Sequence, residues 1–296
     1  MSTAEQYWIP RISFRNILFA MDLSPGSLRA FPFATSIGHH YGGKIFLAHI
    51  VSDEDYDPRQ AESRGMLDKL EAQIEEGLIN MPGGLRDLPH EVLIDHGSIR
   101  AKLLNAANRC EIDLVVIGTH GWQGIKKLLK GSVAEEIAYL AARPVLTVGP
   151  HVSRSWDFKR VLYATDFSAA AARAMPYASS LAHTYDAPML LLHVNEWTSE
   201  EPPVAAEAKT FEFLREQIRM QGYKGSAKDC EVVVEFGLRS ERILDIAATR
   251  EVDLIVMGLN CSTGIRARIA AHLPGSTVFD VISEARCPVL TVPYAG

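Results

Sequence analysis

The sequence predicts an α/β protein made of two tandem copies of one unit, each with a five-stranded parallel sheet flanked by helices. Three observations predict this fold class. The chain has 296 residues, which is enough for two domains at roughly 150 residues each. The chain repeats itself. Within each copy, short β-rich runs alternate with longer helical patterns, which is typical of parallel strands joined by crossover helices.

The repeat is visible without gaps over the first part of each copy. A shift of 144 positions places Phe14–Val51 on Phe158–Asn195, with 14 identities in 38 residues. We therefore expect a first domain at residues 14–150 and a second at 156–296, joined by a short linker.

The later part of the repeat contains an insertion. A shift of 140 pairs Glu111–Gly118 with Glu251–Gly258, and the shift returns to 144 where Gly131 pairs with Gly275. The second copy therefore has four additional residues between Gly258 and Gly275.

The expected strands are nearly continuous apolar runs, which favours strands covered on both faces. In the first copy they are Ile17–Met21, Ile45–His49, His90–Ile94, Leu114–Ile117 and Val145–Val148. Apolar residues at helical spacing mark one face of an amphipathic helix in each copy. They are Met66, Leu67, Leu70, Ile74 and Leu78 in the first copy, and Phe211, Leu214 and Ile218 in the second.

Composition excludes several classes of function. The net charge is −6 and basic residues are scattered, which argues against binding to nucleic acid or to an anionic membrane. No apolar run approaches the roughly 18 residues that span a bilayer, and no secretory signal is visible. The four cysteines have neither paired nor metal-ligand spacing. We expect a protein of the reducing cytoplasm without a metal site.

One loop in the first copy has the composition of a phosphate-binding loop. Gly118 and Gly121 are followed, after nine residues, by Gly131 and Ser132 at the start of a predicted helix. Glycines permit positive φ and let successive amides converge on an anion. A helix N-terminus adds partial positive charge. Ser132 with Glu135 also matches a capping box, a role that is compatible with phosphate binding.

Together these segments resemble the universal stress protein family over about residues 14–294. The resemblance is carried by Ala20-Met-Asp22, Leu47-Ala-His-Ile50, the glycine loop and the closing Pro-Val-Leu-Thr-Val runs. It implies Rossmann-like domains of the adenine nucleotide alpha hydrolase type, with strand order 3-2-1-4-5 and with the two copies paired through their last strands as a pseudo-dimer. It also implies ATP as the ligand, with Mg possible. The residues that would bind ATP are Ala20, Asp22, Ile50, Ile117, Gly118, Gly121, Gly131, Ser132 and Val133.

The second copy departs from this pattern in its loop. Cys261 replaces the second glycine, the loop is four residues longer, and Pro274 removes an amide where the first copy has Lys130. The copy either retains binding or is a degenerate half that serves for pairing. Its corresponding residues are Ala164, Asp166, Val194, Met257, Gly258, Gly275, Ser276 and Thr277.

Several of these residues have a purely structural alternative. Asp22 and Asp166 could shape the approach to the next helix together with the serine two residues later. His49 and His193 are expected to be satisfied strand histidines. Cys261 could be a redox-sensitive thiol if its pKa is lowered near a helix N-terminus.

The function that we expect is an ATP-binding universal stress protein that acts as a stress-response or signalling module. The alternatives are a nucleotide-free interaction scaffold and a slow ATPase. No P-loop, nucleophile elbow or zinc-protease motif is present, so we do not expect an enzyme. The expected partners are an adenine nucleotide, an unidentified protein and a second copy in a homodimer.

Overall fold

The first half of the chain forms five strands and four helices in its described part. The computed structural model describes residues 12–51, 61–81, 84–119, 143–153, 156–196, 212, 230–261 and 276–294. The first elements are β1 (Asn16–Met21), α1 (Pro25–Leu28), α2 (Phe31–Tyr41), β2 (Lys44–Val51) and α3 (Ala61–Ile79). They are followed by β3 (His90–His96), α4 (Ile99–Arg109), β4 (Leu114–Gly118) and β5 (Val145–Val148).

The second half repeats this order of elements. It contains β6 (Val161–Thr165), α6 (Ala169–Thr184), β7 (Met189–Asn195), β8 (Cys230–Phe236), α8 (Arg239–Thr249), β9 (Leu254–Asn260), α10 (Thr277–Glu284) and β10 (Val289–Tyr294). The predicted strands of the first copy are confirmed, and four of the five extend one to three residues beyond the predicted bounds. The predicted helical face at Phe211, Leu214 and Ile218 lies outside the described residues.

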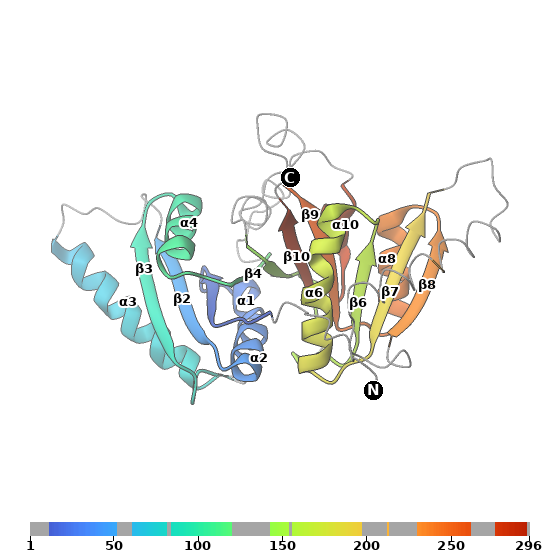
Figure 1. Cartoon of the computed structure of the whole chain (residues 1–296). Coiled ribbons are helices and arrows are strands. Elements are labelled where there is room, and N and C mark those ends of the chain that lie inside the picture. Colours follow the sequence, from blue (N-terminus) through green and yellow to red (C-terminus); the bar gives the residue numbers. More distant parts are fainter. Residues whose placement is uncertain are drawn as a thin grey trace, which may run out of the picture.

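All ten strands form one sheet in the order β3-β2-β1-β4-β5-β10-β9-β6-β7-β8 (Figure 1). Within each half the neighbouring strands are parallel and the order is 3-2-1-4-5, as predicted. The two halves meet where β5 and β10 pair antiparallel, with Leu146 opposite Leu290. The expected internal pseudo-dimer through the last strands is therefore confirmed.

Helices cover both faces of the sheet. On one face, α2, α3 and α6 pack over a single apolar cluster that contains residues of both halves, including Phe31, Ile74 and Leu181. On the other face, α4 covers one cluster, and α8 and α10 cover another. Burial of apolar surface in these three clusters is the main stabilising contribution that the sequence pattern predicts.

The contact between the halves repeats itself about the β5–β10 junction. The hydroxyl of Tyr185 lies 2.9 Å from Ser36 Oγ, and the hydroxyl of Tyr41 lies 3.1 Å from Ser180 Oγ. The two pairs are related by the 144-residue shift. Aromatic pairs obey the same relation, because Phe33–Phe158 and Phe14–Tyr177 both have ring centroids 6.1 Å apart. The halves thus pack as two copies of one surface, like an isologous dimer interface.

Two predictions about burial are only partly correct. On α3, Ile74 and Leu78 are buried as predicted, but Met66 is 44% exposed, so its assignment to the apolar face is wrong. The strand β3 is only half-buried because it is an edge strand with one neighbour. An edge strand lacks the second flanking strand whose side chains would complete its cover.

Candidate functional site

The carboxyl ends of β1 and β4 form the centre of the candidate site in the first half. These strands are neighbours, with Ala20 opposite Ile117. The connections leave them on different faces, since α2 follows β1 on one face and α4 precedes β4 on the other. Such a reversal of strand order is the place where open parallel sheets bind ligands.

Three of the predicted adenosine residues come together there. Ala20 and Ile117 are 4% and 7% exposed and belong to one apolar cluster, and Ile50 packs against it. Ile50 follows Ala48, which lies opposite Ala20 in the sheet. The three side chains therefore form an apolar surface of the kind that accepts a flat ring.

Asp22 lies directly after β1 and is half-buried. Its Oδ1 accepts hydrogen bonds from the amide and the hydroxyl of Ser24. Burial alone would raise the pKa of the Asp22 carboxyl, but hydrogen bonds with Ser24 and Ser27 outweigh it and hold the pKa below 3.8. The structural alternative for Asp22 is thus real, because the carboxylate shapes the turn in which Ser24 caps α1. The same bonds keep it ionised, so it remains an acceptor.

Gly118 has a packing role that its sequence context did not reveal. A Cβ at this position would lie 2.7 Å from the carbonyl oxygen of Gly26 and 2.8 Å from Ser27 Cα. The glycine therefore lets α1 approach β4 closely. The remaining predicted phosphate residues, Gly121, Gly131, Ser132 and Val133, lie outside the described residues.

The turn after the first strand carries an unexpected feature in both halves. Leu23 and Phe167 both have φ of 63°, although such a conformation is unusual for bulky residues. Both side chains are also more than a third exposed. No sequence signal indicated this, since glycine or asparagine is the usual residue at positive φ. The turn is shared by the two copies and lies between the aspartate and the serine that donates to it.

A cavity of about 100 Å³ occupies the equivalent place in the second half. Its walls contain six of the residues predicted there, namely Ala164, Asp166, Val194, Met257, Gly258 and Thr277. Ser276 caps α10, because its Oγ accepts from the Phe279 amide at 3.3 Å. Gly275 lies outside the described residues. Arg239 also lines the cavity, although no sequence pattern pointed to it.

The second half differs from the first around its aspartate. Asp166 is exposed and its Oδ1 accepts from the Ser168 amide at 3.0 Å, so it too shapes a helix approach. The position of Ser27, which supports Asp22, is occupied by Ala171. Gly258 packs against α6, since a Cβ would lie 2.2 Å from the Ala170 carbonyl carbon.

The start of the second loop is tied into the sheet. β9 continues two residues past Gly258, and the Cys261 amide donates to the Tyr294 carbonyl at 2.8 Å. That amide is therefore used within the sheet. Burial raises the pKa of Cys261, whereas a redox-sensitive thiol needs a lowered pKa, so the described surroundings do not favour that hypothesis.

The two strand histidines are satisfied as predicted. His49 Nδ1 lies 3.0 Å from the Met21 carbonyl, and His193 Nδ1 lies 2.7 Å from the Thr165 carbonyl. Both bonds tie the end of the second strand of a half to the end of the first. Among the described residues, no group of three or more His, Cys, Asp or Glu side chains could hold a metal ion.

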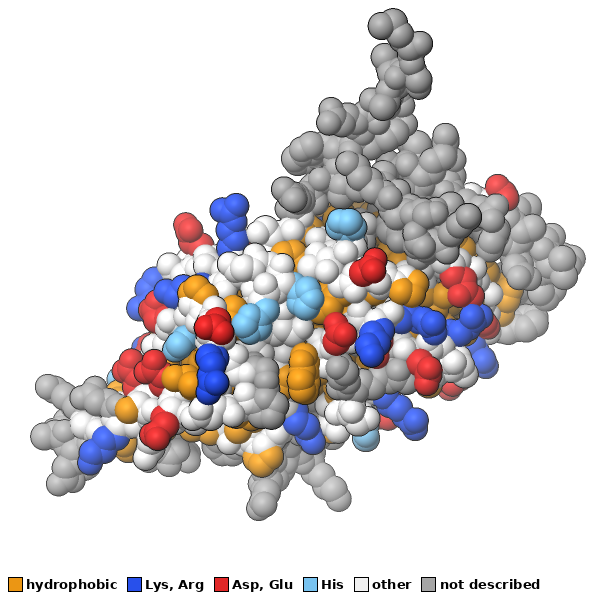
Figure 2. All heavy atoms as spheres, turned by 90° about the horizontal axis from the view of Figure 1, so that it is seen from below, with side chains coloured by type: hydrophobic (Ala, Val, Ile, Leu, Met, Phe, Trp, Pro, Cys, Tyr) orange, Lys and Arg blue, Asp and Glu red, His pale blue; other side chains and the backbone are white. Residues whose placement is uncertain are grey.

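The described surface and helices limit the partners. Figure 2 shows one face on which acidic and basic side chains are interspersed, so the described residues there form no large basic patch. None of the helices in the described ranges combines the length and apolarity needed to cross a membrane.

Comparison with known proteins identifies one family for both halves. The model of the universal stress protein family matches residues 13–149 and 157–293. A universal stress protein of Methanocaldococcus jannaschii is 29% identical over 146 residues, which is 46% of this chain and 82% of that protein. Universal stress protein A homolog 1 of Coxiella burnetii is 29% identical over 142 residues, covering 46% of this chain and 96% of its own.

A solved structure shares the whole two-part architecture. The crystal structure of a universal stress protein from Archaeoglobus fulgidus covers 95% of this chain and 98% of its own, with a TM-score of 0.70. The two sequences are 20% identical, so this likeness concerns the fold alone.

Proposed function

The chain belongs to the universal stress protein family as a tandem member, and on that premise we propose that its first domain binds ATP and acts as a nucleotide-dependent stress-response or signalling module. One observation carries the proposal. Ala20 and Ile117 lie opposite each other at the point where the strand order reverses, with Asp22 two residues after Ala20 and Gly118 directly after Ile117. This is where an open α/β sheet presents a ligand to strand ends.

The described residues fit the adenosine half of ATP. Ala20, Ile50 and Ile117 offer an apolar surface to the base. Asp22, held ionised by its hydrogen bonds, can accept a bond from a ribose hydroxyl. The apolar surface therefore suits the neutral adenine ring, and the Asp22 carboxylate is an acceptor for the two hydroxyl donors of the ribose.

The triphosphate would be held by the glycine loop. In this proposal, the amides around Gly118, Gly121, Gly131, Ser132 and Val133 bind phosphate oxygens, and any Mg is bound chiefly through those oxygens. The proposal includes no catalytic nucleophile or general base, so the protein acts as a binding module and not as an enzyme. We place it in the cytoplasm, where ATP is available.

A contact between the domains supports a role in signalling. The apolar cluster that contains Ala20 and Ile117 also contains Leu259 of the second domain, which is 3% exposed. A ligand that contacts Ala20 and Ile117 therefore touches the cluster that joins the domains. To change the conformation fully, ATP must bind one state about 10⁴-fold more tightly than the other.

The expected partners beyond ATP are a protein and a second copy of the chain. Because β5 and β10 already pair within one chain, a homodimer would have to use a different surface. Light scattering at several protein concentrations tests this assembly: a mass of one chain throughout would contradict it.

Calorimetry with Mg-ATP tests the main proposal. We expect saturable binding to the wild-type chain and loss of that binding in a Gly121→Val, Ser132→Ala variant. The matched control is Cys261→Val with Ser276→Ala, which alters the corresponding positions of the second domain. Binding that survives the first variant but not the control would contradict the assignment to the first domain. No binding by the folded, nucleotide-free wild type would favour the interaction scaffold instead.

A further inference from the structure

The cavity of the second domain combines an apolar floor with one cation from an unexpected element. We propose that it takes a nucleoside monophosphate, and that Arg239 pairs with the single phosphate and selects for it. The inference rests on the proposed function, from which it takes the nucleoside class of ligand. It adds the charge of the ligand and the residue that recognises this charge.

The floor of the cavity is suited to a flat ring. Leu192, Ile243 and Met257 supply apolar side chains from β7, α8 and β9. The volume of about 100 Å³ holds several water molecules, since one needs roughly 10–15 Å³. It is small beside the roughly 300–1,000 Å³ of typical ligand sites, so it would enclose the ring and leave the rest at the mouth.

Arg239 supplies hydrogen-bond donors that lack acceptors. It is the first residue of α8 and lines the cavity, and its Nε is buried without an acceptor among the described residues. Its Nη1 lies 3.4 Å from a carboxylate oxygen of the exposed Glu196. Nearby, Asn195 Nδ2 is also buried without an acceptor in the described part of the chain. Buried donors without acceptors are rare, and an anionic ligand in the cavity would satisfy the Nε of Arg239, which lines it.

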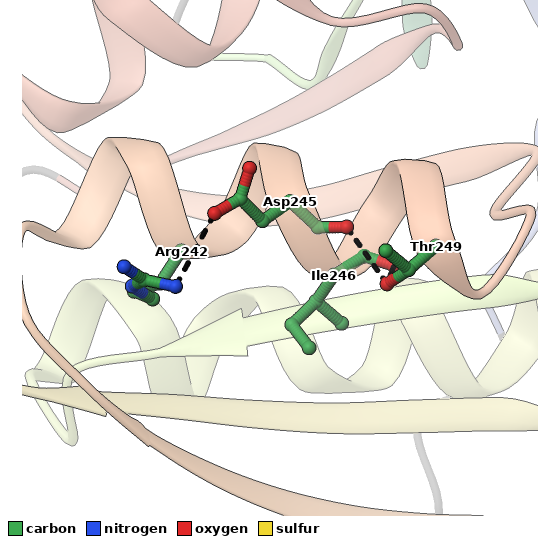
Figure 3. A network of polar contacts seen from close by, with 4 residues as sticks. All are labelled: Arg242, Asp245, Ile246 and Thr249. Carbon is green, nitrogen blue, oxygen red and sulfur yellow. Dashed lines mark hydrogen bonds and ion pairs between the residues drawn. The ribbon is translucent and has the colours of Figure 1, made fainter.

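This cation belongs to the second domain alone. The shift of 140 residues places Arg239 on Ile99 of α4, so the first domain has an apolar side chain at the same position. The next arginine of α8, Arg242, is placed differently. It pairs with Asp245 at 3.3 Å along the helix, as Figure 3 shows, and it does not line the cavity, although its Nε too is buried without an acceptor among the described residues.

The diverged loop explains why one phosphate is preferred to three. The Cys261 amide is bonded to the Tyr294 carbonyl, so it is not available to a β- or γ-phosphate. Arg239 is the only Lys or Arg among the described residues that line the cavity. The acidic residues beside it are Asp166, which also lines the cavity, and Glu196, which forms an ion pair with Arg239. Asp166 suits the hydroxyls of a ribose, while further phosphates would meet its negative charge, and the described lining adds no second cation.

Calorimetry with adenosine, AMP and ATP tests the proposal in a full-length chain carrying Gly121→Val and Ser132→Ala. We expect AMP to bind at least ~10-fold more tightly than adenosine, as a charge-assisted hydrogen bond would give. We expect ATP to show no measurable binding to this variant. Arg239→Ile, which copies the first domain, should abolish the preference for AMP and leave adenosine unchanged. Arg242→Lys, which also copies the residue of the first domain, should alter neither the preference for AMP nor the affinity for adenosine.

Three results would overturn the proposal: AMP binding no tighter than adenosine, a preference that persists in Arg239→Ile, or no binding of any of the three ligands. Residual binding in the first domain is recognised because it does not respond to Arg239→Ile. Failure of the proposed function is a separate result. It would appear as absence of ATP binding to the first domain of the wild type, while the AMP and adenosine comparison above remains interpretable.

Discussion

Replacing Tyr185 with phenylalanine removes one hydroxyl from the contact between the domains and leaves its ring in place. That hydroxyl is 2.9 Å from Ser36 Oγ, and Ser36 is 8% exposed. Losing it leaves a buried hydroxyl without its partner, which costs about 1–3 kcal/mol. The ring contacts with Phe158 at 4.7 Å and His40 at 4.0 Å are retained. The change thus isolates one hydrogen bond across the pseudo-two-fold junction.

Urea unfolding followed by circular dichroism measures this cost. We expect the midpoint to fall without a change in slope, because the same surface is exposed on unfolding. Ser36→Ala combined with Tyr185→Phe should cost less than the sum of the single changes, since no unpaired hydroxyl remains. The reasoning would be refuted if Tyr185→Phe left the midpoint unchanged, or if the two single costs were simply additive.

Three further predictions follow from the same contacts. Leu259→Ala should lower the free energy of unfolding by about 2–5 kcal/mol, because Leu259 is buried in the cluster that joins the domains. Leu238→Ala, at a residue that is 58% exposed, should change the free energy of unfolding by less than about 0.5 kcal/mol. Equal effects of the two substitutions in denaturant titrations would contradict this. Cys261→Gly should not add a second ATP in calorimetric stoichiometry, because the amide at 261 stays bonded to the Tyr294 carbonyl; a gained site would show that the side chain was the obstacle. The carboxylate of Asp22 has a lowered pKa in the folded state, so its stabilising contribution is present above pH 3.8 and is lost as the pH falls through the lowered value. The melting temperatures of the wild type and of Asp22→Asn should therefore converge only in acid. A difference in melting temperature that stays constant down to pH 2 would be inconsistent with this.

Much of the fold could be predicted because its signals are local. Apolar runs such as Leu114–Ile117 are long enough to indicate buried strands, and their bounds agree with the structure within one to three residues. The insertion before Gly275 was visible from the repeat itself. Strand order and pairing through β5 and β10 came from family resemblance, because no local pattern specifies which strands are neighbours.

The parts that were missed depend on residues far apart in the chain. From the sequence, Gly118 looks like a glycine of a phosphate-binding loop. Only its close approach to Gly26 shows that it also lets α1 pack against β4. Arg239 looks like an ordinary residue in the first turn of a helix, because its cavity is completed by strands from elsewhere. Met66 fits the helical period, yet among the α3 side chains that the structure describes the buried ones, Ile74 and Leu78, lie nearer the carboxyl end of the helix. In each case, spacing along the sequence does not determine which side chains meet in space.

Hydrogen exchange with and without Mg-ATP tests the central claim most directly. The account predicts slower exchange in peptides that contain the carboxyl ends of β1 and β4, from Ala20 to Ser24 and from Ile117 to Thr119. The equivalent ends of β6 and β9 should exchange at the same rate as without ATP. Protection confined to the ends of β6 and β9, or no protection at either place at saturating ATP, would contradict an ATP site in the first domain.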